Sequence, residues 1–290
     1  MKTFFCAGGF FVALGLAAVN PALAADQVPS NNPAGVDGSD QEARLVSAFF
    51  GLDNDLPFGA NRLCFGASGK DGMPVVFSHT LDPDTLQAED FEVVTQSGDV
   101  RTPKCVTLRP AQDPGELRTV LLIGEFGDSP DNPPVSVKVV GDLLSDGAPP
   151  VNFNGTRTNV TPLVACPSMV LAEPVPESEW TRKTSSTSCP KGIKQVIRVT
   201  WDGGVRRPDG DEPGEAERKL YRVTVQRPDG SSDEINPFAL AELEDRDNNH
   251  FLCLDTADPA VAISFPAGHL VDPNKDMNPD TRITVSRVVN

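Results

Sequence analysis

Proline is spread along the whole of this chain and restricts it to short structural elements. The 290 residues include 27 prolines. Because proline fixes φ and lacks a backbone N–H, it interrupts helix interiors and is confined to the edges of sheets. The proline content therefore agrees with a chain that has few helical segments. The sequence predicts only single helical turns, at Asp82–Asp90 and Pro237–Glu244.

Short runs rich in Val, Thr, Phe and Leu lie between turn sequences such as Asp-Pro and Ser-Gly-Asp. Runs of this composition predict β-strands. In the first half they are Arg44–Leu52, Val75–His79, Phe91–Thr95, Cys105–Arg109, Arg118–Phe126 and Val135–Val140. In the second half they are Ile193–Trp201, Leu220–Arg227, Phe251–Asp255, Ala260–Phe265 and Arg282–Val288. Their number and spacing predict an all-β fold of sandwich or barrel type.

The first 25 residues have the pattern of a secretory signal peptide. Lys2 precedes an apolar block, Phe4–Ala18, and small residues end the segment at Ala24 and Ala25. The block is shorter than the ~20 apolar residues that a spanning helix needs. We therefore expect cleavage near Ala24 or Ala25, a secreted or periplasmic location, and no membrane span in the mature chain.

The remaining length suits two domains. Residues 26–43 are polar and predict a flexible N-terminus, followed by domains at 44–165 and 166–290. The segment 166–188 resembles a connector. Loss of Lys2 leaves 24 basic and 41 acidic residues, a net charge of −17. Such a charge disfavours nucleic acid and anionic lipid partners, and it leaves the nature of a protein or surface partner open.

Five cysteines follow the signal segment, since Cys6 leaves with it. They are Cys64, Cys105, Cys166, Cys189 and Cys253. An exported protein meets an oxidising environment, in which disulfides are favoured. Chain order favours Cys64–Cys105 and Cys166–Cys189, with Cys253 as the remaining thiol, although other pairings are open.

The segment Val75–Thr95 reads VVFSHTLDPDTLQAEDFEVVT. It resembles the opening of bacterial immunoglobulin-like modules of surface-layer and adhesion proteins, and Val139–Leu144 and Gly268–Asp272 are similar to a later strand and turn of that family. The resemblance covers residues 45–165 and implies two immunoglobulin-like β-sandwich domains outside the cytoplasm, without catalytic residues. In this pattern Phe77 and Phe91 face the core, and Asp82 caps a tight turn.

One acidic loop is a candidate calcium site. Oxygen-bearing side chains occupy alternate positions, at Asp272, Asn274, Asp276, Asn278 and Asp280. Calcium takes six to eight oxygen ligands. The loop departs from an EF-hand, because Met277 replaces the turn glycine and Ile283 the closing glutamate. A second acidic stretch, 245–249, also lacks the turn glycine and the closing glutamate of an EF-hand, and it predicts a plain turn.

Other candidate motifs are weak. Gly66–Lys70 is similar to a phosphate-binding loop, but Cys64 and Asp71 occupy two of its required positions. The three histidines, His79, His250 and His269, lie in no catalytic motif. Acid pairs for glycoside cleavage cannot be recognised from spacing. Asn154 and Asn159 begin glycosylation sequons, whose use depends on the source.

These observations favour an exported, non-catalytic binding or scaffolding protein without a cofactor. The alternatives are a calcium-dependent extracellular module that uses the Asp272–Asp280 loop, and a secreted hydrolase whose site the sequence does not reveal.

Overall fold

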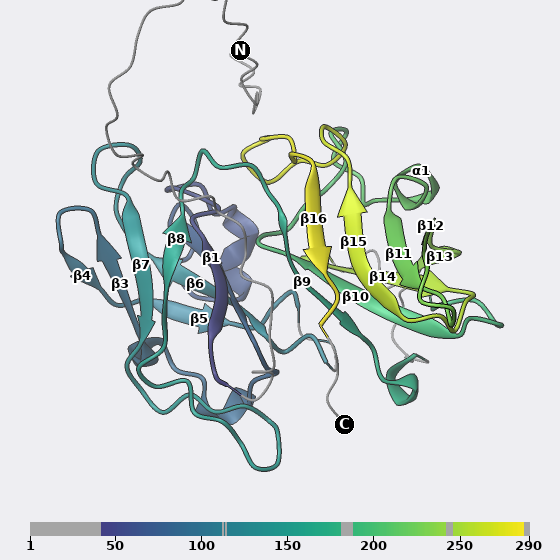
Figure 1. Ribbon diagram of the computed structural model, residues 1–290. Helices are drawn as coiled ribbons and strands as arrows, with labels where there is room; N and C mark the ends of the chain where they lie inside the picture. The colour runs from purple at the N-terminus through teal and green to yellow at the C-terminus, as the bar shows by residue number, and fades with distance from the viewer. Residues whose placement is uncertain (1–41, 112, 114, 181–187, 242–245, 287–290) are drawn as a thin grey trace, which may run out of the picture.

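The computed structural model describes residues 42–111, 113, 115–180, 188–241 and 246–286 (Figure 1). The predicted signal peptide and almost all of the predicted flexible N-terminus lie outside these residues. Strands dominate the described chain, and its one α-helix is α1, Glu215–Arg218. The prediction of a mainly β protein is confirmed.

The first half forms one eight-stranded sheet in the order β4-β3-β7-β8-β1-β2-β6-β5. Its strands are β1 Leu45–Phe49, β2 Asp71–Phe77, β3 Phe91–Thr95, β4 Val100–Arg101, β5 Cys105–Thr107, β6 Thr119–Gly124, β7 Pro134–Val139 and β8 Arg157–Thr161. Neighbours are antiparallel except β1 and β8, which are parallel. The sheet curls around a core that includes Phe77, Phe91, Leu122 and Phe153.

The second half forms two four-stranded sheets that face each other (Figure 1). One has the order β13-β14-β10-β9, with β9 Met169–Pro174, β10 Gln195–Trp201, β13 Ala239–Ala241 and β14 Asn249–Leu254. The other has the order β12-β11-β15-β16, with β11 Arg222–Gln226, β12 Ser232–Ile235, β15 Ala260–Phe265 and β16 Thr281–Thr284. Both sheets contribute to one core around Trp201, Tyr221 and Phe265.

The predicted turn chemistry of the first half is present. Phe77 and Phe91 are fully buried with ring centroids 6.3 Å apart. Asp82 Oδ1 accepts a hydrogen bond from the Asp84 amide at 3.1 Å, so its side chain caps the turn as expected. The predicted helical segment 82–90 forms two short 3₁₀ turns, η2 Pro83–Thr85 and η3 Ala88–Asp90. Two further 3₁₀ turns are η1 Phe58–Arg62 and η4 Glu177–Glu179.

Two local predictions are wrong. The expected connector 166–188 contains β9, because Met169, Leu171 and Ala172 have a buried sheet neighbour in β10. The expected helical turn at Pro237–Glu244 contains β13 instead, which pairs with β14. In both segments tertiary pairing outweighs local propensity, since an edge strand gains its stability from the neighbouring strand.

The disulfides differ in part from the favoured pairing. Cys64 is joined to Cys105, as chain order favours. Cys189 is joined to Cys253 rather than to Cys166, so the expected Cys166–Cys189 bridge is wrong. Cys253 is not a remaining thiol, and the described part of the chain has no free cysteine. The reason is spatial: Cys253 lies in β14 on the sheet face that packs against the segment containing Cys189.

Candidate functional site

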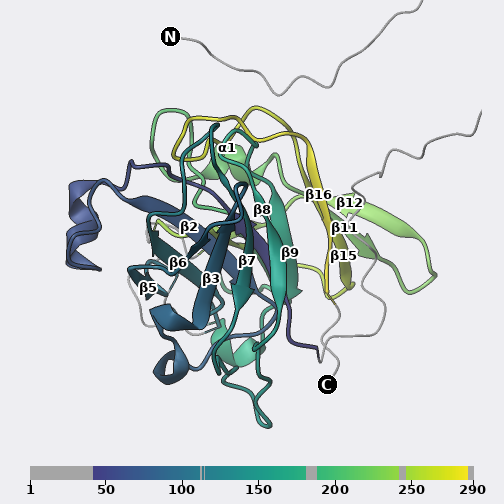
Figure 2. The same cartoon turned by 90° about the vertical axis from the view of Figure 1, so that its left-hand side faces the viewer.

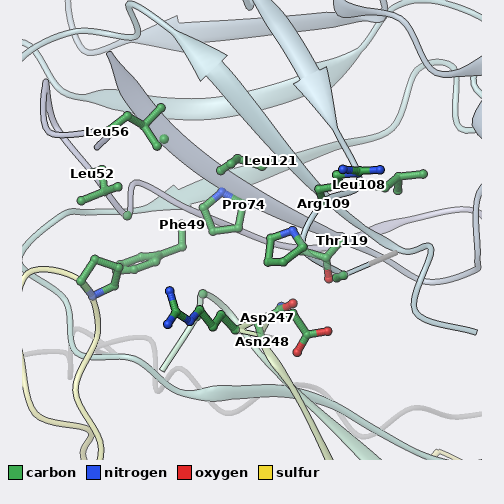
Figure 3. Close-up of a pocket in the computed structure, with 18 residues that line it drawn as sticks. Phe49, Leu52, Leu56, Pro74, Leu108, Arg109, Thr119, Leu121, Asp247 and Asn248 are labelled. Carbon is green, nitrogen blue, oxygen red and sulfur yellow. The ribbon is translucent and has the colours of Figure 1, made fainter. Parts of the chain in front are cut away.

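A pocket with a volume of about 140 Å³ opens between the eight-stranded sheet and loops of the C-terminal sheets (Figure 3). We call it the junction pocket. It is lined by Phe49, Gly51, Leu52, Leu56, Gly72, Pro74, Leu108, Arg109, Pro110, Ala111, Thr119, Leu121, Gly203, Gly204, Arg246, Asp247, Asn248 and Pro273. A cavity of about 150 Å³ holds a benzene ring, so the junction pocket matches one bulky apolar group.

The apolar wall of the junction pocket comes from the outer face of the eight-stranded sheet. Neighbouring side chains of a strand point to opposite faces. Ala48 and Phe50 point into the core of the first half, and Phe49 between them points out toward the C-terminal sheets. Pro74 in β2 and Leu121 in β6 lie between core residues in the same way and line the pocket. The central strands are therefore apolar on both faces.

The opposite wall is mostly backbone. A Cβ atom on Gly203 would lie 3.0 Å from Cδ1 of Phe49, so a side chain at this close approach would require the Phe49 ring to move. At Gly204 a Cβ atom would lie 3.7 Å from the nearest atom, the Asp247 carbonyl oxygen, so this glycine leaves open space. The Asn248 side chain donates to the Trp201 carbonyl at 2.7 Å, which holds the turn at 246–248 against the end of β10.

The charged groups of the junction pocket differ in burial and in hydrogen bonding. The Asp247 carboxylate is buried and accepts hydrogen bonds from the Asn249 amide at 2.7 Å and the Asn249 side chain at 3.0 Å. Arg109 and Arg246 are exposed on the rim. Guanidinium groups at the mouth of an apolar cavity favour a ligand that carries negative charge beside its apolar part.

Outside the pocket lining, a buried ion cluster joins the segment before β6 to the C-terminal half. Glu173 in β9 contacts Arg118 at 3.1 Å and Arg198 in β10 at 2.5 Å. Burial alone would raise the pKa of Glu173, but the charges of Arg198 and Arg118 hold that pKa below its usual range. The Asn274 side chain also donates to the Gly51 carbonyl at 2.7 Å, across the same junction.

Two buried carboxyl groups, those of Asp202 and Asp272, directly precede the pocket-lining residues Gly203 and Pro273 in the chain. Burial raises the pKa of Asp202 to about 7; the Ser168 amide opposes that shift, and the charge of Asp272 adds to it. Burial also raises the pKa of Asp272 to about 6. Asp272 accepts a hydrogen bond from the Asp276 amide at 2.9 Å through Oδ1.

The structure uses several of the predicted calcium ligands for other purposes. Asn278 accepts from the amides of His269 and Leu270 and donates to two backbone carbonyls. Asp280 accepts from the Ala267 amide at 3.1 Å. Asn274 donates to the eight-stranded sheet, as described above. Across the described residues, no three His, Cys, Asp or Glu side chains form a metal-binding group. Calcium binding by this loop stays a prediction.

The other candidate residues lie outside the lining of the junction pocket, except Asp247 and Asn248. Asp247 lies in the turn that leads into β14 and accepts a hydrogen bond from the amide of Asn249, the first residue of that strand, as the sequence predicts for an acidic turn. Lys70 pairs with Glu125 on the surface. His250 is buried beside Tyr221, with its Nδ1 2.6 Å from the phenol oxygen, and burial lowers its pKa to about 4.

Sequence reasoning missed the junction pocket because its residues come from many separate stretches of chain. One signal was available: the run Thr119–Gly124 is apolar without alternation, which indicates a strand buried on both faces. That signal predicts a second covered face for β6. It does not predict that the cover comes from Gly203, Gly204 and the turn at 246–248.

Comparisons with known proteins give little further guidance. No protein-family model matches the chain, and no curated protein sequence matches it. The structure is similar to that of surface layer protein SbsC, domains 1-6, with 11% sequence identity and a TM-score of 0.28. The match covers 84% of this chain and 41% of that one, so the chain spans less than half of its length. At this TM-score the likeness supports no inference about fold or function.

The described residues include no helix that is long and apolar enough to cross a membrane.

Proposed function

We propose that this protein is an exported, non-catalytic binding protein made of two immunoglobulin-like sandwich domains, at 44–165 and 166–290. In this proposal it acts in the periplasm or outside the cell and binds its partner in the junction pocket. The two facing C-terminal sheets and the curled eight-stranded sheet support the domain arrangement. The Cys64–Cys105 and Cys189–Cys253 disulfides support an oxidising compartment, because such bonds persist there.

The junction pocket is the observation that carries the proposal. The junction pocket combines its apolar wall with two exposed arginines, in a chain whose net charge is −16. We infer a partner that presents one bulky apolar group next to an acidic group. The apolar part fills the space over Gly204, and the acidic part reaches Arg109 or Arg246 at the rim.

The chemistry of the lining supports binding over catalysis. The polar side chains around the junction pocket are those of Arg109, Thr119, Arg246, Asp247 and Asn248. This set of described residues has no histidine, serine, cysteine or lysine, which are the usual nucleophiles and proton carriers. Asp247 is already bound by Asn249, and a base needs a free oxygen directed at its substrate.

Binding of 1-anilinonaphthalene-8-sulfonate tests the proposal, because this probe joins aromatic rings to an anion. We expect saturable fluorescence enhancement from one site. Gly204→Leu fills the pocket and should abolish that enhancement without unfolding the protein, since the added Cβ meets only ordinary contact. Arg109→Ala and Arg246→Asn should weaken it, and asparagine suits the positive φ of 65° at position 246.

Gly147→Leu is the matched control, because it adds the same side chain to an exposed loop outside the pocket lining. It should bind the probe as the wild type does. Equal binding by the wild type and Gly204→Leu would refute the junction pocket as the binding site.

A further inference from the structure

The loop Leu56–Lys70 between β1 and β2 exposes three large apolar side chains, although it buries Leu56 and two alanines. We call it the clamped loop. Phe58 is 83% exposed, Phe65 is 93% exposed and Leu63 is 41% exposed. Ala60 and Ala67, by contrast, are buried against Ile123. Exposing a phenylalanine forgoes about 1.5–3 kcal/mol of burial, so this inversion indicates a surface that meets an apolar partner.

The clamped loop is held in this arrangement. Leu56 donates to the Lys70 carbonyl at 3.1 Å, and Gly69 donates to the Leu56 carbonyl at 2.8 Å, which closes the two ends on each other. The Cys64–Cys105 disulfide joins the middle of the loop to β5. Figure 2 shows the segment with η1 standing away from the sheets at the left of the view. The exposed rings are therefore presented on a fixed support.

The charge of the clamped loop differs from that of the whole chain. Residues 56–70 contain Arg62 and Lys70 and no acidic residue. Of the two acidic residues that flank this range, Asp71 is buried and Asp55 is exposed. Lys104 lies beside the loop, with its Nζ 3.2 Å from the position of a Cβ on Gly66. Lys70 is paired with Glu125, so Arg62 and the exposed Lys104 are the main cations here. Asp55 is the exposed acidic neighbour of the loop along the chain and offsets part of this positive charge, whereas salt screens the acidic residues that lie farther away than roughly 8 Å.

We propose that the clamped loop docks the protein on an anionic lipid surface, with Phe58, Leu63 and Phe65 entering the interface and Arg62 and Lys104 meeting phosphates. Projecting rings beside cations fit a fluid lipid surface, which moulds around them. A protein partner would need a matching cavity for each ring. Three side chains of this size give weak, reversible attachment, which anchors a binding protein without a spanning helix.

Vesicle co-sedimentation of the full exported chain, with its disulfides intact, tests this inference. We expect binding to phosphatidylcholine vesicles that contain a quarter phosphatidylglycerol, and weaker binding to phosphatidylcholine alone. Phe58→Ser/Phe65→Ser should lower the partition coefficient at least about tenfold, since it removes two rings from the interface. Arg62→Ala/Lys104→Ala should lower it only for the anionic vesicles.

Phe238→Ser is the matched control, because Phe238 is 53% exposed on the C-terminal half and should not affect sedimentation. Gly204→Leu should also leave vesicle binding unchanged, which separates this inference from the proposed function. An unchanged melting temperature of each variant shows that the fold is intact. Equal sedimentation of wild type and Phe58→Ser/Phe65→Ser, or no sedimentation at millimolar lipid, would overturn the inference. A loss of self-association in that variant without vesicle binding would assign the loop to a second copy of the chain instead.

Discussion

At Glu173 a single carboxylate faces two buried guanidinium groups from different sheets. Arg118 leads into β6 of the eight-stranded sheet, and Arg198 lies in β10. Both arginines are at least nine-tenths buried. Without the carboxylate, two like charges would remain in a site with little water, and this is the situation in which loss of one ionic partner is most costly.

We predict that Glu173→Ala lowers the free energy of unfolding by about 3–5 kcal/mol. Chemical denaturation of both proteins measures this difference. Glu125→Ala is the control, since Glu125 forms an exposed pair with Lys70 and its loss should cost no more than about 1 kcal/mol. A similar small effect for both variants would show that the Glu173 cluster does not stabilise the junction.

Because burial raises the pKa of Asp202, this residue should lower the stability of the fold as the pH rises, whereas a carboxylate with a lowered pKa lowers stability as the pH falls. The folded-state pKa of Asp202 is about 7, against 3.8 as the ordinary value. The folded state therefore holds a proton that the unfolded state releases between these two values, and stability falls as the pH rises through that window. Asp202→Asn should melt at a higher temperature than the wild type at pH 8. The difference should shrink by pH 5; a difference that does not vary with pH would contradict this account.

Individual residues were predictable where one local rule decided their position. The core positions of Phe77 and Phe91 and the capping role of Asp82 follow from strand alternation and turn chemistry. Phe58 and Phe65 break the usual rule that large apolar residues are buried. Their exposure depends on the disulfide and the loop closure around them, which no local pattern reveals.

At the scale of elements, the Cys189–Cys253 disulfide connects the segment before β10 to β14. It closes a stretch with a sequence separation of 64 residues. A cross-link of this span removes loop entropy from the unfolded chain, which corresponds to about 4 kcal/mol.

We therefore predict that Cys189→Ala/Cys253→Ala lowers the free energy of unfolding by about 2–4 kcal/mol in a denaturant titration. Peptide mapping without reduction should first recover the fragments of Cys189 and Cys253 as one linked species. Recovery of a Cys166–Cys189 species instead would contradict the pairing, and a double variant as stable as the wild type would contradict its energetic role.

Strands were predicted correctly where the sequence itself has a strong β-forming composition. They were missed where the strand depends on pairing with a neighbouring strand. Phe91–Thr95 and Ala260–Phe265 form strands with the predicted bounds. β9 and β13 are edge strands whose sequences contain proline, alanine or glutamate and give little β signal. Their pairing with β10 and β14 creates the strand, and pairing is not visible in a local window.

At the scale of the whole molecule, two halves meet along an apolar face that neither half covers alone. Phe49 packs on Gly203, Asn274 binds Gly51, and Glu173 joins the two arginines. The junction pocket is the part of this interface that remains open. Because its walls come from distant parts of the chain, the sequence could predict the mainly β fold and not the site.

Backbone amide chemical-shift mapping during a titration with 1-anilinonaphthalene-8-sulfonate tests the central claim most directly. If the junction pocket is the binding site, the amides of Gly72 and Leu121 on one wall should shift together with those of Gly203 and Asn248 on the other. The saturation curves of these four amides should coincide. The amide chemical shifts of the clamped loop should not change, except at Leu56, which also lines the pocket. Shifts confined to the clamped loop, or scattered without a common saturation point, would contradict the claim.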